Sequence, residues 1–359
     1  MLSVLLITLG DPSRLTGGYL FHRRMADRAA ANGARLRFVS FPERPFLLSP
    51  LDGPRVFRRA LASRPDAIVL DSICTAQAAP YLRLRCPRVP LVAMLHQPPG
   101  GIDFGPLRTR VQAVLDQDAY RHARLLLAAS EDLRDQLLQA GVPAARLRVV
   151  PPGRDVSSEV GPPPGDLRRG RRAALLCVGN WMARKGILPL LEAFAHVPAD
   201  LATLHLVGDT AVEPRYAARV HARLARADLA GRVVVHGAIS LAEVAAFYLA
   251  ADAFVLPSMK EPFGTVYGEA MAYGLPVLGW RAGNLPHLAT DGVEGFVVEP
   301  GDLPGLARAM ATIAADEPLR RRMGEAARRR ALARPTWDDT AALFFGAIRE
   351  AIREGRTEK

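Results

Sequence analysis

Short apolar segments alternate with amphipathic segments along nearly all of the 359 residues, and this alternation constrains the fold more than any other feature. In the first half, apolar runs that we expect to be strands lie at residues 2–8, 36–41, 67–72, 91–95, 125–130 and 147–153. Segments of helical character lie between them. Buried strands separated by helices predict a parallel, doubly wound sheet.

A stretch rich in proline, glycine and charge at 157–172 interrupts the alternation and predicts a linker. The pattern then restarts, with expected strands at residues 173–179, 202–208, 232–237, 253–257, 275–280 and 295–299. We therefore expect an α/β protein of two doubly wound, Rossmann-like domains. Such sheets bind ligands beyond the carboxyl ends of their strands, so a cleft between the domains is the expected site.

The expected domain bounds follow from these patterns. The first domain is predicted to cover residues 1–155 and the second residues 173–335, with the linker at 156–172 between them. The last segment, 336–359, is predicted to be a helix that packs back on the first domain.

The composition is that of a globular protein, with 49% hydrophobic and 23% charged residues. Three scattered cysteines suit a reducing compartment and offer neither a disulfide framework nor a metal-binding knuckle. The N-terminal MLSVLLITLG has no basic leader and predicts a buried first strand, not a signal peptide. No apolar run reaches the roughly 18 residues of a membrane span, so we expect a cytoplasmic protein.

Positive charge is concentrated in the first half of the chain. Residues 1–152 carry 21 Arg and no Lys against 12 acidic residues, whereas residues 153–359 carry 26 basic against 24 acidic residues. This excess favours an anionic partner, such as a phosphorylated substrate, an acidic lipid or a nucleic acid. A solvated arginine-rich surface is the alternative.

The stretch MKEPFGTVYGEAMAYG places Glu261 and Glu269 eight positions apart, around the expected start of a helix. Thr265 is a plausible N-cap, which would leave the first amides of the helix, with Gly264, as donors to an anionic or hydroxyl oxygen. We expect Glu269 in the first turn and Glu261 in the loop ahead of it. Carboxylates accept bidentate hydrogen bonds from vicinal hydroxyls, so the residues point to a polyol beside a phosphate. Alternatively, Glu269 only complements the helix dipole and Glu261 is solvated.

The spacing EPFGTVYGEAMA resembles the two-glutamate signature of the retaining GT-B glycosyltransferases of family 4. Further similar motifs follow in order along nearly the whole chain, namely TGGYLFH, HQPPG, VVPPGRD, VGNWMARKG, LHLVGD, VVVHGAI and ADAFVLPS. The resemblance implies two Rossmann-like domains that face each other across a cleft. It also implies transfer of a sugar from a nucleotide sugar to a hydroxyl acceptor with retention of anomeric configuration.

The resemblance assigns the donor contacts in the second domain. Glu269 is expected to hold the ribose hydroxyls. Glu261 and the backbone of Phe263, Gly264 and Thr265 are expected to contact the donor sugar, where glycine allows a close backbone approach.

The loop VGNWMARKG is expected to hold the diphosphate. Lys185 matches the family's lysine, but Asn180 stands where the family usually has arginine, and Arg184 is the candidate to supply that charge. The chain has 44 Arg and only three Lys, of which Lys185 and Lys260 fall in donor motifs. We interpret Lys260 as a bystander.

In the first domain, Gly17 and Gly18 are expected to form a loop that brings backbone amides to the diphosphate, with Arg14 close by. His96 ends an expected strand, and the resemblance places it next to the donor sugar, although the following Gln97-Pro98-Pro99 is unusual. His22 is expected to pack or to face solvent. Asp118 and Tyr120, on a helix beside the cleft, are weaker candidates for acceptor contacts.

The expected mechanism is electrostatic, with His96, Lys185 and Glu261 as the catalytic group. Cations and helix amides would stabilise the departing nucleoside diphosphate. No DxD run and no His/Asp cluster at metal-ligand spacing occurs near these motifs, so we expect no metal ion. We also expect no cofactor, because the nucleotide sugar is a co-substrate. The family's route is a front-face reaction through an oxocarbenium-like state.

The first domain is expected to bind the acceptor. RVFRRALASR (55–64) and LRTRVQAVLDQ (107–117) mix arginine with apolar residues and suit an anionic membrane surface, or are ordinary helices covering the sheet. We hypothesise an acceptor that is anionic or membrane-bound, without nucleic acid, for a protein in contact with the inner membrane face. The rival hypotheses are a catalytically idle sugar-nucleotide binder and a nicotinamide-dependent oxidoreductase, although neither domain has GxGxxG after its first strand.

Overall fold

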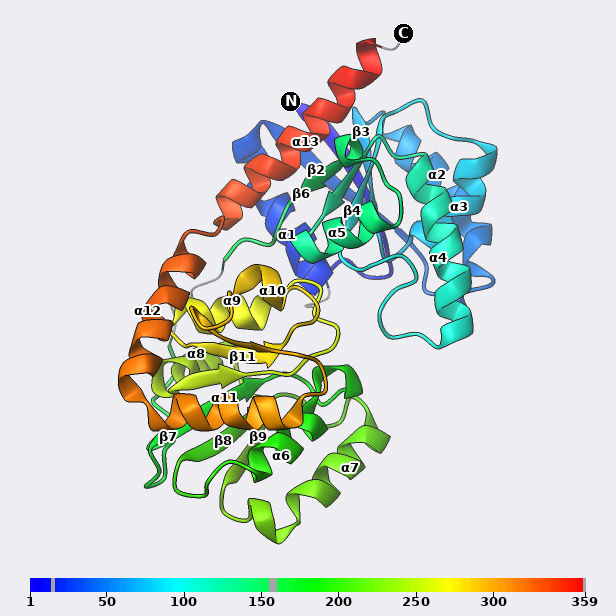
Figure 1. Cartoon of the computed structure of the whole chain (residues 1–359). Helices are drawn as coiled ribbons and strands as arrows, with labels where there is room; N and C mark the ends of the chain where they lie inside the picture. Colours follow the sequence, from blue (N-terminus) through cyan, green and yellow to red (C-terminus); the bar gives the residue numbers. More distant parts are fainter. Residues whose placement is uncertain (14–16, 155–159, 358–359) are drawn as a thin grey trace. The chain divides into compact units, whose positions relative to one another are not determined.

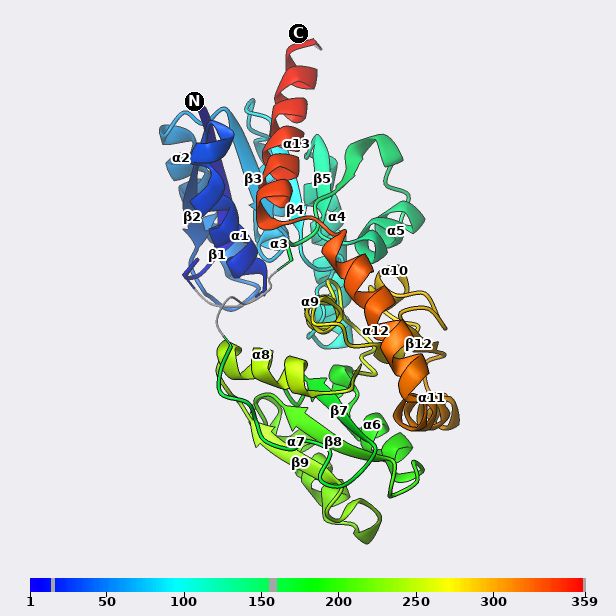
Figure 2. The same ribbon diagram turned by 90° about the vertical axis from the view of Figure 1, so that its left-hand side faces the viewer.

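The computed structural model describes residues 1–13, 17–154 and 160–357, and the chain divides into two compact units. Unit 1 comprises Met1–Gly153 together with Pro335–Lys359, and unit 2 comprises Arg154–Arg334. Arg14 lies outside the described residues. Each unit contains one six-stranded parallel sheet covered by helices (Figures 1 and 2).

The strands of unit 1 are β1 (Leu2–Leu9), β2 (Ala34–Phe41), β3 (Ala67–Asp71), β4 (Leu91–Leu95), β5 (Leu125–Ala128) and β6 (Leu147–Val149). Its helices are α1 (Gly17–Arg28), α2 (Gly53–Ala62), α3 (Thr75–Leu84), α4 (Pro106–Arg121), α5 (Glu131–Gln139) and α13 (Trp337–Thr357). Short 3₁₀ turns are η1 (Ala30–Asn32), η2 (Ser49–Asp52) and η3 (Ala144–Arg146).

The sheet of unit 1 has the order β2-β1-β3-β4-β5-β6. Pairing is parallel and in register along β1 and β2, from Leu2 opposite Ala34 to Leu9 opposite Phe41. β3, β4 and β5 are buried over their whole length because helices cover both faces. Helices α1 and α13 pack together on one face, and α2, α3 and α4 lie on the other (Figure 2).

The strands of unit 2 are β7 (Ala173–Val178), β8 (Ala202–Val207), β9 (Val233–Gly237), β10 (Ala253–Val255), β11 (Val277–Trp280) and β12 (Gly295–Val298). Its helices are α6 (Ile187–Ala195), α7 (Pro214–Leu224), α8 (Leu241–Ala250), α9 (Thr265–Ala272), α10 (Leu285–Leu288), α11 (Leu303–Ala315) and α12 (Glu317–Leu332). The turns are η4 (Ala183–Lys185) and η5 (Ala227–Leu229).

The sheet of unit 2 has the order β12-β11-β10-β7-β8-β9, so its chain moves outward from β7 to β9 and then crosses to β10. Side-chain caps fix the starts of several helices. Ser240 and Glu243 form a reciprocal capping box on α8, and Asp316 accepts a hydrogen bond from the amide of Leu319 at 2.8 Å.

All twelve expected strands are confirmed, most of them one or two residues shorter than the apolar runs that predicted them. In β3, β5, β7, β8, β10 and β12 the last one or two residues of the run already belong to the loop that leaves the sheet, whereas β9 and β11 begin one or two residues later than expected. In the segment expected to be a linker, the described residues form neither helix nor strand. They are not detached from unit 2, because Leu167 is buried in its core and the amide of Gly161 bonds the carbonyl of Ala242 at 2.8 Å.

The last helix, α13, completes unit 1. Phe344 and Phe345 are fully buried, and the Thr340 hydroxyl donates to the carbonyl of Pro151 at 2.9 Å. Arg148 forms an ion pair with Glu350, but both side chains are about one-third exposed, so this pair adds little stability. Apolar burial therefore holds α13 in place.

We expect Phe344→Ala to lower the free energy of unfolding of unit 1 by about 3–5 kcal/mol, because it leaves a cavity beneath α13. The matched control is Leu343→Ala, since the neighbouring Leu343 is 46% exposed, and its effect should stay within about 0.5 kcal/mol. Urea unfolding, with hydrogen exchange in β1–β5 as the probe of unit 1, measures the effect of both substitutions. Equal effects of the two substitutions would show that α13 is not part of the cooperative unit.

Candidate functional site

The strand order of each sheet reverses at one point, and the loops that leave the two strands there diverge. In unit 2 this point lies between β7 and β10, and in unit 1 it lies between β1 and β3. Diverging loops leave a crevice at the carboxyl edge of the sheet, where doubly wound domains bind their ligands. Most of the site residues expected from the sequence follow these strands or their immediate neighbours.

In unit 2, Lys185 and Glu261 form an ion pair at this crevice. Lys185 ends the turn η4 after β7, and Glu261 lies in the loop after β10. The Nζ of Lys185 donates to Oε2 of Glu261, and each residue is only 9% exposed. Because both charges are largely withdrawn from water, removing either partner would leave a costly uncompensated charge.

Arg184 adds a second cation beside the same carboxylate. Its Nη1 lies 3.9 Å from Oε2 of Glu261 and donates to the carbonyl of Lys260 at 2.9 Å. The guanidinium of Arg184 is thus turned toward the loop after β10. Lys260 itself contributes its backbone here, while its side chain is exposed.

Two glycines allow the loops around this pair to pack closely. Gly186 has φ +74°, and a Cβ there would lie 2.1 Å from the carbonyl oxygen of Pro257. Gly264 has φ +70°, and a Cβ there would lie 2.5 Å from Cδ1 of Leu288. A larger residue at Gly186 would push the loops after β7 and β10 apart, and one at Gly264 would displace Leu288 of α10.

The start of α9 differs from the expectation. The N-cap is Gly264, in the left-handed conformation, and Thr265 is the first helical residue rather than the cap. No side chain caps this end within the described residues, so the first amides of α9 remain available to a ligand oxygen. The αL conformation of Gly264 makes the turn that a threonine cap would otherwise have made.

Glu269 lies in the second turn of α9, not the first, because the helix begins only at Thr265. It accepts a hydrogen bond of 3.1 Å from the hydroxyl of Tyr248. Burial, and then the charge of Glu269, raise the pKa of Tyr248 well above its usual range, so the phenol remains a donor. Tyr248 was not expected from the sequence. Phe263 is half-buried, and its carbonyl accepts from Asn284 Nδ2 at 2.9 Å.

Asn180 connects the loops that leave β7 and β8 at the carboxyl edge of the sheet of unit 2. Its Oδ1 accepts the amide of Asp209 at 3.1 Å, and the amide of Trp181 donates to the carbonyl of Asp209 at 2.8 Å. A Cβ on Gly208 would lie 2.2 Å from the carbonyl oxygen of Gly179, so the two loops touch. Asn180 therefore orders the backbone where the family usually places a cation.

In unit 1, Gly17 and Gly18 are the first residues of α1, which corrects the expectation that they form a loop. Their amides belong to a helix N-terminus, and the first four amides of a helix have no partner within it. A Cβ on Gly18 would lie 3.3 Å from Cδ2 of His96. Gly18 thus lets α1 pack directly against the imidazole of His96.

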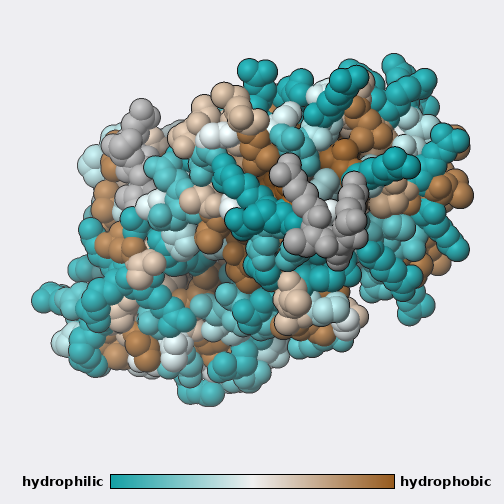
Figure 3. Space-filling model, turned by 90° about the horizontal axis from the view of Figure 1, so that it is seen from above, coloured by the Kyte–Doolittle hydropathy of each residue, from teal (hydrophilic) through white to brown (hydrophobic). Residues whose placement is uncertain are grey.

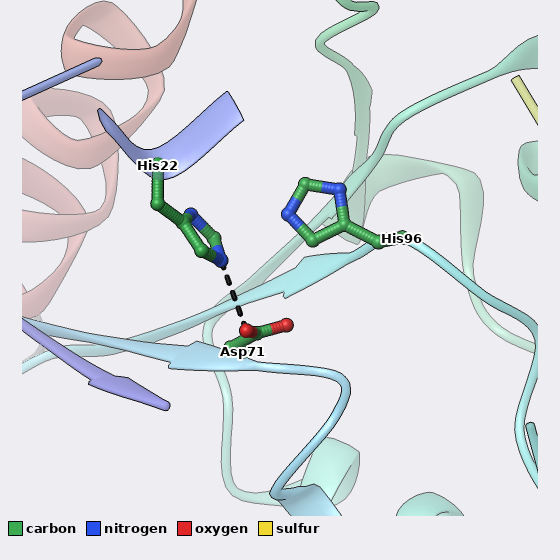
Figure 4. Close-up of side chains that lie close together, drawn as sticks. All are labelled: His22, Asp71 and His96. Carbon is green, nitrogen blue, oxygen red and sulfur yellow. Dashed lines mark ion pairs between the residues drawn. The ribbon is translucent and has the colours of Figure 1, made fainter. Parts of the chain in front are cut away.

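His22, Asp71 and His96 form a buried cluster at the point where the strand order of unit 1 reverses (Figure 4). Nε2 of His22 lies 3.0 Å from Oδ2 of Asp71, which also accepts from the hydroxyl of Thr8 at 2.7 Å. The rings of His22 and His96 meet edge to face with centroids 4.7 Å apart. The backbone amide of His96 donates to the Ser72 hydroxyl at 3.0 Å.

The charge states in this cluster follow from its burial. Burial alone would raise the pKa of Asp71, but the charge and hydrogen bond of His22 outweigh it and lower the pKa to about 2. Burial, and then the neighbouring His22, lower the pKa of His96 to about 3. Near neutral pH Asp71 is therefore a carboxylate and His96 is neutral. A neutral imidazole can donate or accept a hydrogen bond, but it has no acidic proton to give as a general acid.

The same three residues have the composition of a transition-metal site. One ligand atom from each lies within 4.8 Å of the others, and two imidazoles with a carboxylate suit zinc or iron. The sequence has no His/Asp cluster at metal-ligand spacing near its motifs, but the fold brings these three residues together. The three residues come from segments far apart in the sequence, and no spacing motif connects them. Asp71 was missed for the same reason, although it ends a strand, and His22 is neither solvent-exposed nor simply packed.

The acceptor candidates on α4 are only partly where the sequence suggested. Tyr120 is buried in the core of unit 1, and Asp118 forms an ion pair with Arg121 at 3.8 Å. Asp116, on the same helix, is 1% exposed and accepts hydrogen bonds from the amide of Gly100 at 2.9 Å and from the Thr75 hydroxyl. Burial raises the pKa of Asp116 to about 6. Through its hydrogen bond to the amide of Gly100, Asp116 anchors the loop that begins at His96.

Comparisons with known proteins agree with this architecture. The family described as "Glycosyl transferase 4-like domain" matches residues 2–153, and the family "Glycosyl transferases group 1" matches residues 166–330. A D-inositol 3-phosphate glycosyltransferase of Xylanimonas cellulosilytica is 30% identical over 240 residues, which cover 64% of this chain and 57% of the relative. The chain thus spans little more than half the length of such a curated relative.

Solved structures share the fold. Sucrose-phosphate synthase of Thermosynechococcus elongatus has a TM-score of 0.83 at 22% identity, and the match covers 99% of this chain and 100% of the chain in that structure. HepE of Anabaena, in complex with UDP and glucose, has a TM-score of 0.76 at 22% identity over 98% of this chain and 100% of its own.

Two doubly wound domains, each with its site at the reversal of strand order, define the GT-B fold class. The chain belongs to the glycosyl transferases of group 1, with a glycosyl transferase 4-like domain in its first half. Among the described residues, no helix combines the length and apolar character that crossing a bilayer would require.

The burial of His96 predicts a pH dependence of the stability of unit 1. Its pKa is about 3 when folded and 6.5 for the free side chain, so between these values the unfolded chain binds one proton more. The free energy of unfolding should therefore fall as pH falls through this window, by about 1.4 kcal/mol per pH unit from this group.

His96→Gln should remove this component of the slope. Urea unfolding of both proteins from pH 8 to pH 5, with hydrogen exchange in β1–β5 as the probe of unit 1, measures it. Above about pH 7 the two stability curves should run parallel, which serves as an internal control. An unchanged slope below pH 6.5 would mean that His96 is solvated or protonated in the folded chain.

Proposed function

We propose that the protein is a glycosyltransferase that moves a sugar from a nucleoside-diphosphate sugar to a hydroxyl acceptor with retention of anomeric configuration. The observation that carries this proposal is the buried Lys185–Glu261 pair beside the uncapped N-terminus of α9. A cation, a carboxylate and helix amides together suit a ligand with both phosphate and hydroxyl groups. Membership of the group 1 glycosyl transferases supports the same reaction class.

Within unit 2, Lys185 and Arg184 are proposed to hold the diphosphate. An ammonium group has three donors, so Lys185 can bond Glu261 and still direct the others to a phosphate oxygen. Glu261 with the backbone of Phe263, Gly264 and Thr265 is proposed to bind the donor sugar, and Glu269, oriented by Tyr248, to bind the ribose. Asn180 is proposed to act through the loop it orders rather than through charge.

His96 is proposed to donate or accept a hydrogen bond at the donor sugar as a neutral imidazole, with the Gly17 and Gly18 amides at the diphosphate. Each well-placed electrostatic donor to the departing phosphate is worth about 3–4 kcal/mol of barrier. The leaving phosphate is proposed to help deprotonate the acceptor in a front-face reaction. On this proposal neither a metal ion nor a cofactor takes part, and the nucleotide sugar is a co-substrate.

Unit 1 is proposed to bind the acceptor, which we expect to be anionic. A pocket of about 290 Å³ at the carboxyl edge of this sheet is lined by Gly10, Phe41, Arg55 and Arg59, among others. Two arginines suit a phosphate or carboxylate group. The relative from Xylanimonas cellulosilytica carries the name of an enzyme acting on a phosphorylated polyol, which fits this chemistry. We propose a cytoplasmic protein in peripheral contact with an anionic membrane.

A donor screen tests the proposal most directly. We expect slow hydrolysis, and a thermal shift, with at least one of the UDP-, GDP- or ADP-sugars. Binding without hydrolysis or transfer would indicate a catalytically idle sugar-nucleotide binder, in line with Asn180 at the usual arginine position. No hydrolysis and no thermal shift with any donor would overturn the proposal.

Substitutions at the donor site should separate binding from turnover. We expect Glu269→Ala to weaken donor binding about tenfold through loss of charge-assisted hydrogen bonds. Lys185→Ala should lower kcat by about 10²–10³, at least as much as it raises KM, because leaving-group charge develops in the transition state. The matched control is Lys260→Ala, which removes an exposed lysine from the adjacent loop and should leave both constants unchanged.

Metal independence is tested with chelators. We expect EDTA, and then 1,10-phenanthroline, to leave donor hydrolysis within about twofold of the untreated protein, because cations and amides of the chain neutralise the leaving group. Loss of activity that returns with Zn²⁺ or Mn²⁺ would contradict this. It would also assign a resident metal to His22, Asp71 and His96.

A further inference from the structure

The C-terminal half of helix α4 buries apolar residues such as Ala119 and Tyr120, but its N-terminal half exposes an apolar stripe. Its side toward the protein buries the polar residues Gln112 and Asp116. Its outward side carries Leu107, Val111 and Val114, which are 77%, 42% and 67% exposed and stand at i, i+4 and i+7. An amphipathic helix normally buries its apolar stripe, so this stripe lacks a covering partner within the described residues.

A second apolar segment lies beside the start of α4. The guanidinium of Arg108 stacks over the ring of Phe104 at 3.6 Å and over that of Phe46 at 5.0 Å. Arg108 thus joins the loop before η2 to the loop before α4. We call the combined set the apolar rim: Phe46, Leu47, Leu48, Leu51, Phe104, Leu107, Val111 and Val114.

The apolar rim exceeds the scattered apolar exposure that any protein surface shows. On the face in Figure 3, apolar patches are interspersed among hydrophilic side chains, which is ordinary for a folded chain. In the rim, Leu47 is 84% and Leu51 is 74% exposed within a single short segment. A contiguous exposed apolar surface of this kind marks a binding surface for a protein, a membrane or a ligand.

Positive charge accompanies the apolar rim. Exposed arginines lie on α4 (Arg108 and Arg110) and on α2, which directly follows η2 (Arg55, Arg58 and Arg59). The nearby acids carry less free charge, because Asp52 pairs with Arg44 at 3.2 Å, and Glu43 and Asp103 each have an interaction partner. The surface therefore combines exposed apolar side chains with arginines on the same and the adjoining elements.

We propose that the apolar rim inserts into an anionic lipid bilayer and that the neighbouring arginines bind the lipid phosphates. Apolar side chains that enter the acyl region, with arginines at headgroup level, are the pattern of interfacial binding. A second copy of the chain fits less well, since a twofold interface would bring the arginines of both copies together. A nucleic acid would leave the leucines and valines in water.

The position of the apolar rim also indicates the chemical class of the acceptor, an inference that rests on the proposed function. The loop between β4 and α4 begins at His96 and contains Phe104, so one loop connects the buried cluster of unit 1 to the apolar rim. The pocket with Arg55 and Arg59 is formed partly by α2, which follows η2 directly. The geometry therefore assigns an acceptor with an anionic head that enters this edge while its apolar tail stays in the bilayer.

Vesicle sedimentation of the full chain tests the proposal without any donor or turnover. We expect binding to phosphatidylcholine vesicles that contain about 30% phosphatidylglycerol, weak binding to phosphatidylcholine alone, and a decrease with salt. Leu107→Ser/Val111→Ser should weaken binding to the anionic vesicles at least tenfold. Both side chains are exposed, so the variant should fold, which circular dichroism and donor hydrolysis check.

The matched control is Leu84→Ser, because Leu84 is 83% exposed on α3 but lies outside the apolar rim. It should bind vesicles like the wild type. Equal vesicle binding by the wild type and the double variant, or no binding by either, would overturn the proposal. A concentration-dependent dimer that the double variant abolishes would instead show self-association through the rim. Vesicle binding without donor hydrolysis would support the membrane surface while refuting the proposed function.

Discussion

The reversal of strand order in each parallel sheet is the constraint on which the remaining architecture depends. In unit 2 the chain leaves β7 toward one edge and β10 toward the other, and in unit 1 it does the same from β1 and β3. Backbone pairing cannot fill the crevice between such diverging loops, so side chains line it and a ligand can enter it. Lys185 meets Glu261 at one of these points, and His22 meets Asp71 at the other.

The two clusters solve the problem of buried charge in different ways. Lys185 and Glu261 neutralise each other as an ion pair, with Arg184 close by. Asp71 is stabilised as a carboxylate by His22 and Thr8, which outweigh the cost of burial. His96 avoids the cost by remaining neutral, as its pKa of about 3 requires. Groups held in this way are ordered before any ligand arrives, which is the property that electrostatic catalysis needs.

Much of this could be predicted from local sequence. The twelve apolar runs predict the strands because most of these parallel strands are buried on both faces and carry few polar residues. Glu261, Gly264 and Glu269 could be predicted as a group because one loop and one helix carry them. The details of α9 could not. Whether a helix begins at a threonine cap or after a left-handed glycine depends on close packing, here of Gly264 against Leu288.

The sequence by itself determined two doubly wound sheets, the order of their strands along the chain and the motifs that follow each strand. Only the tertiary structure decided which of those motifs meet, because contact across a sheet depends on spatial strand order. His22, Asp71 and His96 lie far apart in the sequence and touch only because β1, β3 and β4 are neighbours. Likewise, the helical period of α4 can be predicted locally. Only the tertiary structure decides that Gln112 and Asp116 lie on its buried side, which turns Leu107, Val111 and Val114 toward solvent.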